Sequence, residues 1–298
     1  MSKNETYVSS NFGKFGRWLI NFWAAITMLY LFAPIFVIIA FSFNDPNGRF
    51  NFVWNGFTTK HWTKTIAGGE RNKFFYPELN EALLRSVWIA AVTAIIATTL
   101  GTLMAFALVR YKLKGTGALS TLLVLPLTTP EIVLGASLFT MFLDFSFNLG
   151  GSEITFPFGA VTIVLAHVMF CMSYVTLTIK ARMRGFNWQL EDAAQDLGAT
   201  PRKAFFKVTL PLATPGIFAA GLLSFALSLD DFIITLFVNG DLETFPIRVF
   251  GQSRTSIPPQ INVLSTILLL VTTSLFVIPT VVSVRKAKKL EKSRTIAT

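Results

Sequence analysis

The sequence predicts an all-α, polytopic membrane protein with six transmembrane helices. Apolar residues make up 52% of its 298 positions and charged residues only 14%, a balance outside the usual range of soluble domains. Six separate apolar windows are each long enough to cross the hydrocarbon core as a helix. We expect these spans at residues 18–43, 83–109, 118–143, 160–180, 212–238 and 261–284.

The first window predicts a helix that is retained. Its apolar run is longer than the short core of a signal peptide, so we do not interpret it as a cleaved leader. The chain is then one transmembrane domain, 18–284, between an N-terminal segment, 1–17, and a basic tail, 285–298. The outer loop 44–82 is too long for a simple connector, and loops of this length bind a partner or contain short helices.

The net charge of +10 predicts an orientation in the membrane and not a nucleic-acid partner. With both termini cytoplasmic, the inner segments 1–17, 110–117, 181–211 with Lys180 at its edge, and 285–298 hold 18 of the 26 Lys and Arg residues. This asymmetry follows the positive-inside rule. We expect the basic tail to contact the headgroups of membrane lipid.

The inner connection 181–211 is polar and predicts a hairpin of two short helices. Asn187 is placed to cap a helix that runs to Leu197, and Gly198 supplies the left-handed residue that ends it. Thr200 then caps a second helix, which has a proline in its first turn. We expect Leu210-Pro211 to close that helix.

The charged side chains of this hairpin are expected to face water or a partner. A simple reversal of the chain needs only a few residues, whereas a protruding knob of about thirty residues suits a groove on a cytoplasmic protein. A solvated hairpin that only reverses the chain is the alternative. The charged residues are Glu191, Asp192, Asp196, Arg202, Lys203 and Lys207.

The hairpin resembles the "EAA" loop of bacterial ABC importer permeases. The family pattern is Glu-Ala-Ala, three residues, Gly, and then a hydrophobic-Leu-Pro ending, and Asp192 stands here where the family usually has Glu. In that family the loop docks on the ATPase subunit. The resemblance therefore implies a set of ATPase-coupling residues, namely Glu191, Asp192, Ala193, Ala194, Asp196, Gly198, Leu210 and Pro211.

Three acids lie inside the spans, where a charge is costly and indicates function. They are Glu131, just after Pro126 and Pro130, which we expect to kink that helix, and the adjacent Asp230 and Asp231. The spans around them contain no Lys or Arg, so a passing cation, a base on a second subunit or protonation must compensate the charge. These carboxylates favour a cationic, flexible substrate over a sugar or an oxyanion.

Adjacent helical residues point about 100° apart, so the two aspartates cannot face one path equally. We expect one to line the path and the other to bond a neighbouring helix, and the sequence does not decide which. A structural alternative has the acids capped by hydroxyls such as Ser228 and Thr129. Tyr174 and Trp88 are weaker candidates for the path, because their rings can stack on an amine.

Two other kinds of site are not expected. The chain has no Walker-type glycine loop, so it does not itself hydrolyse ATP. His61 and His167 stand apart from any ligand cluster, so we expect no metal site and assign His167 to hydrogen bonding between helices.

A closer resemblance covers nearly the whole chain from about residue 18. The phrases FSFN (41–44), GFTTKHW (56–62), TPEIVLGASL (129–138), EDAAQDLGA (191–199) and LSLDDF (227–232) are similar to those of the PotC-type permeases of spermidine/putrescine ABC importers. The resemblance implies the type I importer permease (MetI-like) fold, in the bacterial cytoplasmic membrane.

That family implies three kinds of protein partner and a division of labour. A second permease subunit, two ATPase subunits and an extracytoplasmic polyamine-binding protein would join this chain, and ATP and Mg would be bound by the ATPase, leaving no cofactor here. Two alternatives stay open: a related permease for another cationic or amino-acid-like solute, and a proton-coupled secondary transporter.

Overall fold

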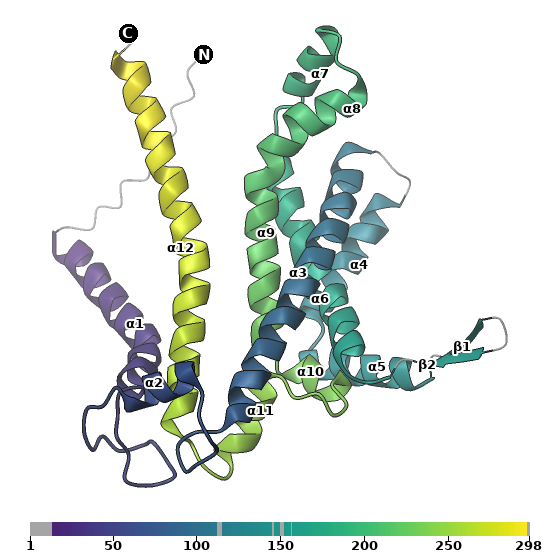
Figure 1. Ribbon diagram of the computed structural model, residues 1–298. Coiled ribbons are helices and arrows are strands. Elements are labelled where there is room, and N and C mark those ends of the chain that lie inside the picture. The colour runs from purple at the N-terminus through teal and green to yellow at the C-terminus, as the bar shows by residue number, and fades with distance from the viewer. Residues whose placement is uncertain (1–13, 112–114, 145, 150–151, 156, 297–298) are drawn as a thin grey trace.

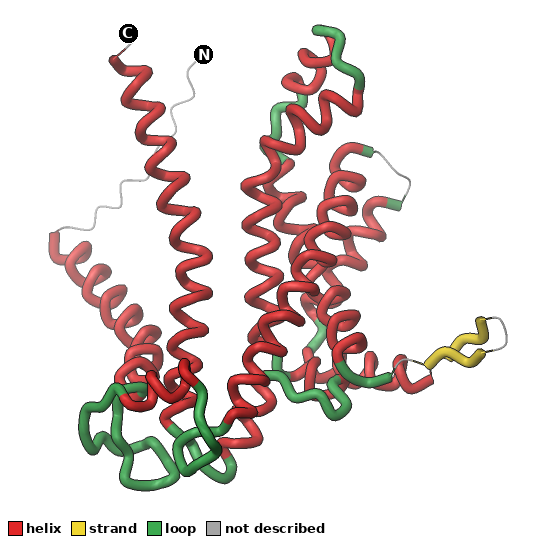
Figure 2. Tube along the Cα trace, in the orientation of Figure 1, coloured by secondary structure: helices red, strands yellow, loops and turns green. Residues whose placement is uncertain are grey.

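The computed structural model describes residues 14–111, 115–144, 146–149, 152–155 and 157–296, and these are almost entirely helical (Figures 1 and 2). The elements are α1 (Lys14–Phe41), α2 (Lys60–Ala67), α3 (Pro77–Arg110), α4 (Thr116–Thr128), α5 (Glu131–Asp144), β1 (Ser146–Leu149), β2 (Ser152–Thr155), α6 (Ala160–Met183), α7 (Gln189–Asp196), α8 (Pro201–Ala204), the π-helical turn η1 (Phe205–Thr209), α9 (Leu210–Asp230), α10 (Ile233–Val238), α11 (Phe245–Ser253) and α12 (Pro259–Ile296).

The prediction of six spans is confirmed with one change of shape. Five described helices are long and apolar enough to cross a membrane, and a sixth span requires α4 and α5 to be counted together. Those two helices meet at an angle of 106°, so the expected kink in the span 118–143 is present as a sharp break between two helices. The cause is Pro130, which disfavours the helical conformation for the residue before it, and Thr129 is accordingly extended with ψ of 132°.

The fifth span also differs from the prediction at both ends. A continuous helix runs from Pro201 to Asp230, so Leu210-Pro211 does not close the preceding helix. A proline ring clashes with the carbonyl four residues earlier in a regular α-helix, and here the wider η1 turn directly precedes Pro211. At the other end the helix stops at Asp230, Asp231 is extended, and α10 starts at Ile233.

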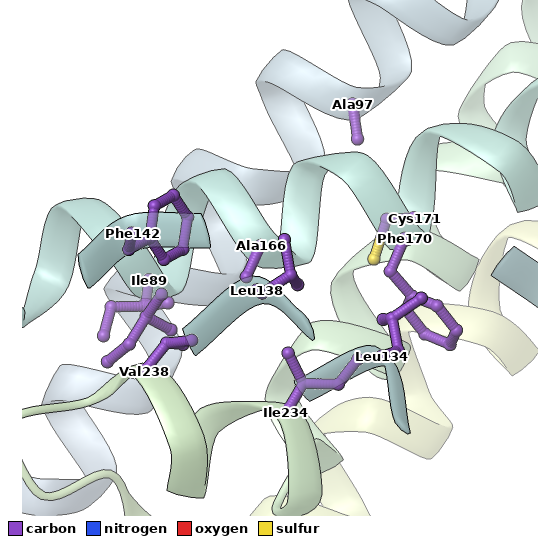
Figure 3. Close-up of a cluster of buried hydrophobic side chains, with 11 residues drawn as sticks. Ile89, Ala97, Leu134, Leu138, Phe142, Ala166, Phe170, Cys171, Ile234 and Val238 are labelled. Carbon is purple, nitrogen blue, oxygen red and sulfur yellow. The ribbon is translucent and has the colours of Figure 1, made fainter. Parts of the chain in front are cut away.

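Helices α3, α6 and α9 pack together as the centre of the structure. Gly101 on α3 permits a close approach to α6, because a Cβ atom at this position would lie 2.6 Å from Cγ1 of Val175. A cluster of buried apolar side chains joins α3 and α6 to α5 and α10 (Figure 3). It contains Ile89, Ala97, Leu134, Leu138, Phe142, Ile163, Ala166, Phe170, Cys171, Ile234 and Val238.

Helix α1 contacts α12 and lies to one side of this centre (Figure 1). The membrane-spanning window of α1 buries none of its residues within this chain. Helix α12 continues past the expected end of its span and through most of the predicted tail, to Ile296. Of the predicted N-terminal segment, residues 1–13 lie outside the described residues.

The outer loop after α1 folds against the start of α12. Asn44 is fully buried and donates to Oδ1 of Asn51 at 2.7 Å, and the loop carries the short helix α2. Burial lowers the pKa of His61, on α2, despite an opposing effect from Asp45 at 3.8 Å. A small antiparallel hairpin of β1 and β2 projects from the connection between α5 and α6, an exception to the all-α prediction (Figure 2).

Candidate functional site

The two helix breaks described above meet at one cavity. Its volume is about 490 Å³, and α5 and α10, the short helices after each break, pack against each other. The described residues that line it include three carboxylates and no Lys or Arg. They are Glu131, Phe170, Tyr174, Leu223, Ala226, Leu227, Asp230, Asp231, Phe232 and Ile233. The structure thus brings together all three intramembrane acids that the sequence singled out.

Glu131 and Asp230 reach this cavity from the two ends of helices. Glu131 is the first residue of α5 and Asp230 is the last residue of α9, and both are exposed within this chain. The last carbonyl groups of a helix have no partner within it and carry partial negative charge. The end of α9 therefore adds to the negative potential at Asp230, whereas the partial positive charge at the start of α5 offsets part of the charge of Glu131.

Asp231 is held by its own chain. Its Oδ2 atom lies 3.1 Å from Nε2 of His167 on α6, and it accepts hydrogen bonds from the backbone N–H and the hydroxyl of Thr235 at 2.8 and 2.7 Å. Nδ1 of His167 lies 2.7 Å from Oγ of Ser228. Asp231 is therefore the aspartate that bonds a neighbouring helix, as expected for one of the pair, and the expected hydrogen-bonding role of His167 is confirmed.

The two aromatic candidates have different positions. Tyr174 lines the cavity, and its ring meets that of Phe170 edge to face, with ring centroids 5.1 Å apart. Trp88 lies on α3 with 45% of its surface exposed and is not part of the cavity wall. The structure brings Tyr174 to the acids and does not bring Trp88 there.

A second cavity adjoins the first and shares Asp230 with it. Its volume is about 660 Å³, and it is lined by residues of α9, α11 and α12 together with Ile38 of α1. Ala226 also belongs to both walls. Asp230 is thus the carboxylate common to the two spaces.

The hairpin at the far end of α9 has the predicted turn. The Asn187 side chain accepts from the N–H of Gln189, and Gly198 has the left-handed φ of 89° that ends the first helix. Thr200 then accepts a hydrogen bond from the N–H of Lys203 through its hydroxyl at the start of α8. The correction concerns only the second helix, which continues into α9.

Most of the residues assigned to ATPase coupling remain accessible on this hairpin. Leu197 exposes 89% of its surface. Among the coupling residues, Asp192, Ala193, Asp196, Gly198 and Pro211 are exposed, and Ala194 and Leu210 are half-buried.

Glu191 is the exception, and the expectation that it faces water or a partner is wrong. Only 2% of its surface is exposed. Oε1 lies 2.5 Å from a guanidinium nitrogen of Arg110, at the end of α3, and Oε2 accepts from the hydroxyl of Thr209 at 2.5 Å. Sequence reasoning missed this contact because Arg110 lies 81 residues earlier in the chain.

The chain was compared with known proteins. The family model described as "Binding-protein-dependent transport system inner membrane component" matches residues 97–289. The spermidine/putrescine transport system permease protein PotC of Haemophilus influenzae is 35% identical over 87% of this chain and 94% of its own length. The putrescine transport system permease protein PotI of Escherichia coli K12 is 35% identical over 83% of this chain and 85% of its own.

A solved structure is also similar in fold. It is that of a bacterial ABC transporter involved in the import of the acidic polysaccharide alginate, with a TM-score of 0.63 at 14% identity. The match covers 90% of this chain and 96% of the other. At this identity the similarity concerns the fold alone.

Proposed function

The chain belongs to the family of binding-protein-dependent transport system inner membrane components, and we propose that it is the permease subunit of an ATP-driven importer of polyamines. The similarity to permeases of spermidine and putrescine systems extends over most of the chain. The single observation that carries the substrate class is the cavity where Glu131, Asp230 and Asp231 converge.

Electrostatics favours a substrate with several positive charges. Carboxylates inside a membrane are costly when they have no partner, and neighbouring like charges raise that cost. His167 and Thr235 satisfy Asp231, whereas Glu131 and Asp230 make no ion pair with any residue that the structure describes. A polyamine carries amines joined by methylene chains, so two of its amines match these two carboxylates.

The walls between the acids suit the methylene segments of such a substrate. Leu223, Leu227 and Phe170 are apolar, and the ring face of Tyr174 offers a site for an amine. A neutral sugar would bury few apolar groups here, and an anion would meet carboxylates where it needs donors. Asp230 borders both cavities. An amine that moves from one cavity to the other therefore stays in contact with this carboxylate.

The proposed complex contains a second permease, two ATPase subunits and an extracytoplasmic polyamine-binding protein. The hairpin of α7 and α8 and the C-terminal end of α12 lie at the same end of the structure (Figure 1). The excess of Lys and Arg in the inner segments supports a cytoplasmic position for this end and for both termini. The hairpin is then available to an ATPase, which binds the ATP and Mg, and the outer loop faces the binding protein.

Uptake by the reconstituted complex tests the substrate class. Radiolabelled spermidine and putrescine would be offered with the wild-type chain and with Glu131→Gln and Asp230→Asn, and we expect uptake to fall at least tenfold in both variants. Asp144→Asn is a matched control, because this exposed carboxylate lies at the other end of α5 and is not in the cavity wall. Unchanged uptake in both cavity variants would remove these acids from the path.

Competition identifies the cargo. We expect excess unlabelled polyamine to abolish uptake and excess arginine or choline to leave it unchanged. Inhibition by arginine equal to that by spermidine would assign the permease to another cationic solute. ATP-independent uptake by this chain alone would indicate a secondary transporter.

A further inference from the structure

Glu191 connects three elements through one buried carboxylate. The residue belongs to the first turn of α7, and its two oxygens contact different parts of the chain. Oε1 pairs with Arg110 at the end of α3, and Oε2 accepts a hydrogen bond from Thr209, the last residue of η1. The carboxylate therefore joins α7 both to α3 and to the turn from which α9 starts.

One of the two helices that Glu191 reaches, α9, also forms part of the wall of the proposed path. Helix α9 ends at Asp230, and α3 packs along α9 and α6. Asp192 and Asp196 of α7, by contrast, are exposed. Glu191 thus lies between the surface available to a partner and the helices that carry the cavity.

Stability alone is a weak reason for such a contact. A buried ion pair loses much of its Coulomb energy to desolvation, and well-packed apolar residues of similar volume often stabilise a fold as well or better. The hairpin already has an apolar anchor, since Phe186, Trp188 and Phe205 pack against the buried cluster of α3, α6 and α9. An ion pair differs from apolar packing because short charge-assisted hydrogen bonds fix the relative orientation of the two side chains.

We infer that Glu191 is a positioning residue that makes α7 move together with the cytoplasmic ends of α3 and α9. The inference rests on the proposed function, because it requires an ATPase that displaces α7. The exposed acids of the hairpin contact that ATPase, and Glu191 transmits the displacement to the helices of the path. Arg110 and Thr209 are the two residues through which Glu191 passes the displacement to α3 and α9.

A distance measurement tests this inference directly. Spin labels would be placed at the exposed positions Gln189, on α7, and Tyr111, just after α3, in a complex whose other subunits lack cysteine. Cys171 is the only cysteine of this chain and is buried, so it does not compete for the label. With Glu191 intact, we expect the distance between the labels to stay constant when ATP is added. A shift in the intact chain would overturn the inference.

Two variants remove the connection in different ways. The double variant Arg110→Met/Glu191→Met replaces the pair by apolar residues of similar length, and Glu191→Gln keeps the volume but removes the charge. In each we expect the distance between the labels to change on addition of ATP, and polyamine uptake per ATP hydrolysed to fall at least fivefold. If the double variant does not assemble, the label distance and uptake of Glu191→Gln alone decide whether the inference stands.

Glu81→Gln is the matched control, because it breaks an exposed ion pair with Arg85 on the same helix, α3. We expect it to leave both readouts unchanged. An assembled Glu191 variant with a constant label distance and normal uptake per ATP would overturn the inference. The distance readout uses ATP without cargo, so an error in the assigned substrate would not alter it.

Discussion

Nε2 of His167 lies 3.1 Å from Oδ2 of Asp231, and this contact distinguishes two adjacent carboxylates. Asp231 is turned toward α6 and α10, with its side chain 6% exposed. Asp230, one residue earlier, is exposed and borders both cavities. The sequence predicted that one of the two would bond a neighbouring helix, and the structure assigns that role to Asp231.

Substitution of the two aspartates separates transport from stability. Asp230→Leu should abolish uptake and leave the melting temperature of the purified complex unchanged, because the Asp230 carboxylate, exposed in this chain, makes no hydrogen bond to the described residues. Asp231→Leu should destabilise the protein by about 1–3 kcal/mol, because His167 and Thr235 lose their acceptor. Thermal unfolding in detergent measures both. Equal losses of stability would contradict the assignment.

His167→Leu tests the other side of the same contact. The variant leaves Ser228 and Asp231 without their buried partner, and we expect destabilisation of about 1–3 kcal/mol. His167→Gln retains a polar group at this position and should recover part of the loss. Thermal unfolding of the three proteins side by side is the measurement, and a melting temperature of His167→Leu equal to wild type would show that the contact contributes nothing.

Gly198 is predicted to be intolerant of β-branched residues for backbone reasons alone. Its φ is 89°, and a Cβ atom at this position would meet no other atom within 4 Å. Gly198→Val should therefore cost about 1–3 kcal/mol through backbone strain and lower uptake per ATP hydrolysed. Gly198→Asn should be milder, because asparagine tolerates the left-handed conformation. Similar behaviour of the two variants would argue against this turn as the cause.

Gly101 is predicted to be intolerant for the opposite reason, lack of space. A Cβ atom here would lie 2.6 Å from Cγ1 of Val175 and 3.2 Å from the carbonyl oxygen of Met172. Gly101→Ala should destabilise the protein by about 1–3 kcal/mol through overpacking. Val175→Ala should partly restore the melting temperature in the double variant. Independent, additive losses would show that the two positions do not compete for the same volume.

The sequence predicted features that depend on local chemistry. The turn at Gly198, the cap at Thr200 and the existence of the apolar spans follow from residues close together in the chain, and the structure agrees with them. A disturbance of the third span near Pro130 was also expected. The size of the bend, 106°, was not expected, because it depends on the elements against which α5 packs.

Contacts between distant segments were not predictable from one sequence. The pairing of Glu191 with Arg110 spans 81 residues, and nothing near Glu191 indicates it. The absence of Lys and Arg from the spans around the intramembrane acids did not predict a partner for Asp231, whereas the structure provides His167. A mid-span histidine in a chain with mid-span acids is the signal that was available.

The unbroken helix from Pro201 to Asp230 fixes the rotational position of Asp230, the carboxylate shared by the two cavities, relative to the hairpin of α7 and α8. With 3.6 residues per turn, one residue added or deleted anywhere in this interval would rotate Asp230 by about 100° relative to α7, while every side chain elsewhere stayed the same. The number of residues between Pro201 and Asp230 is therefore as important for transport as their chemical character. Homologous permeases should vary in the amino-acid composition of this segment far more readily than in its length.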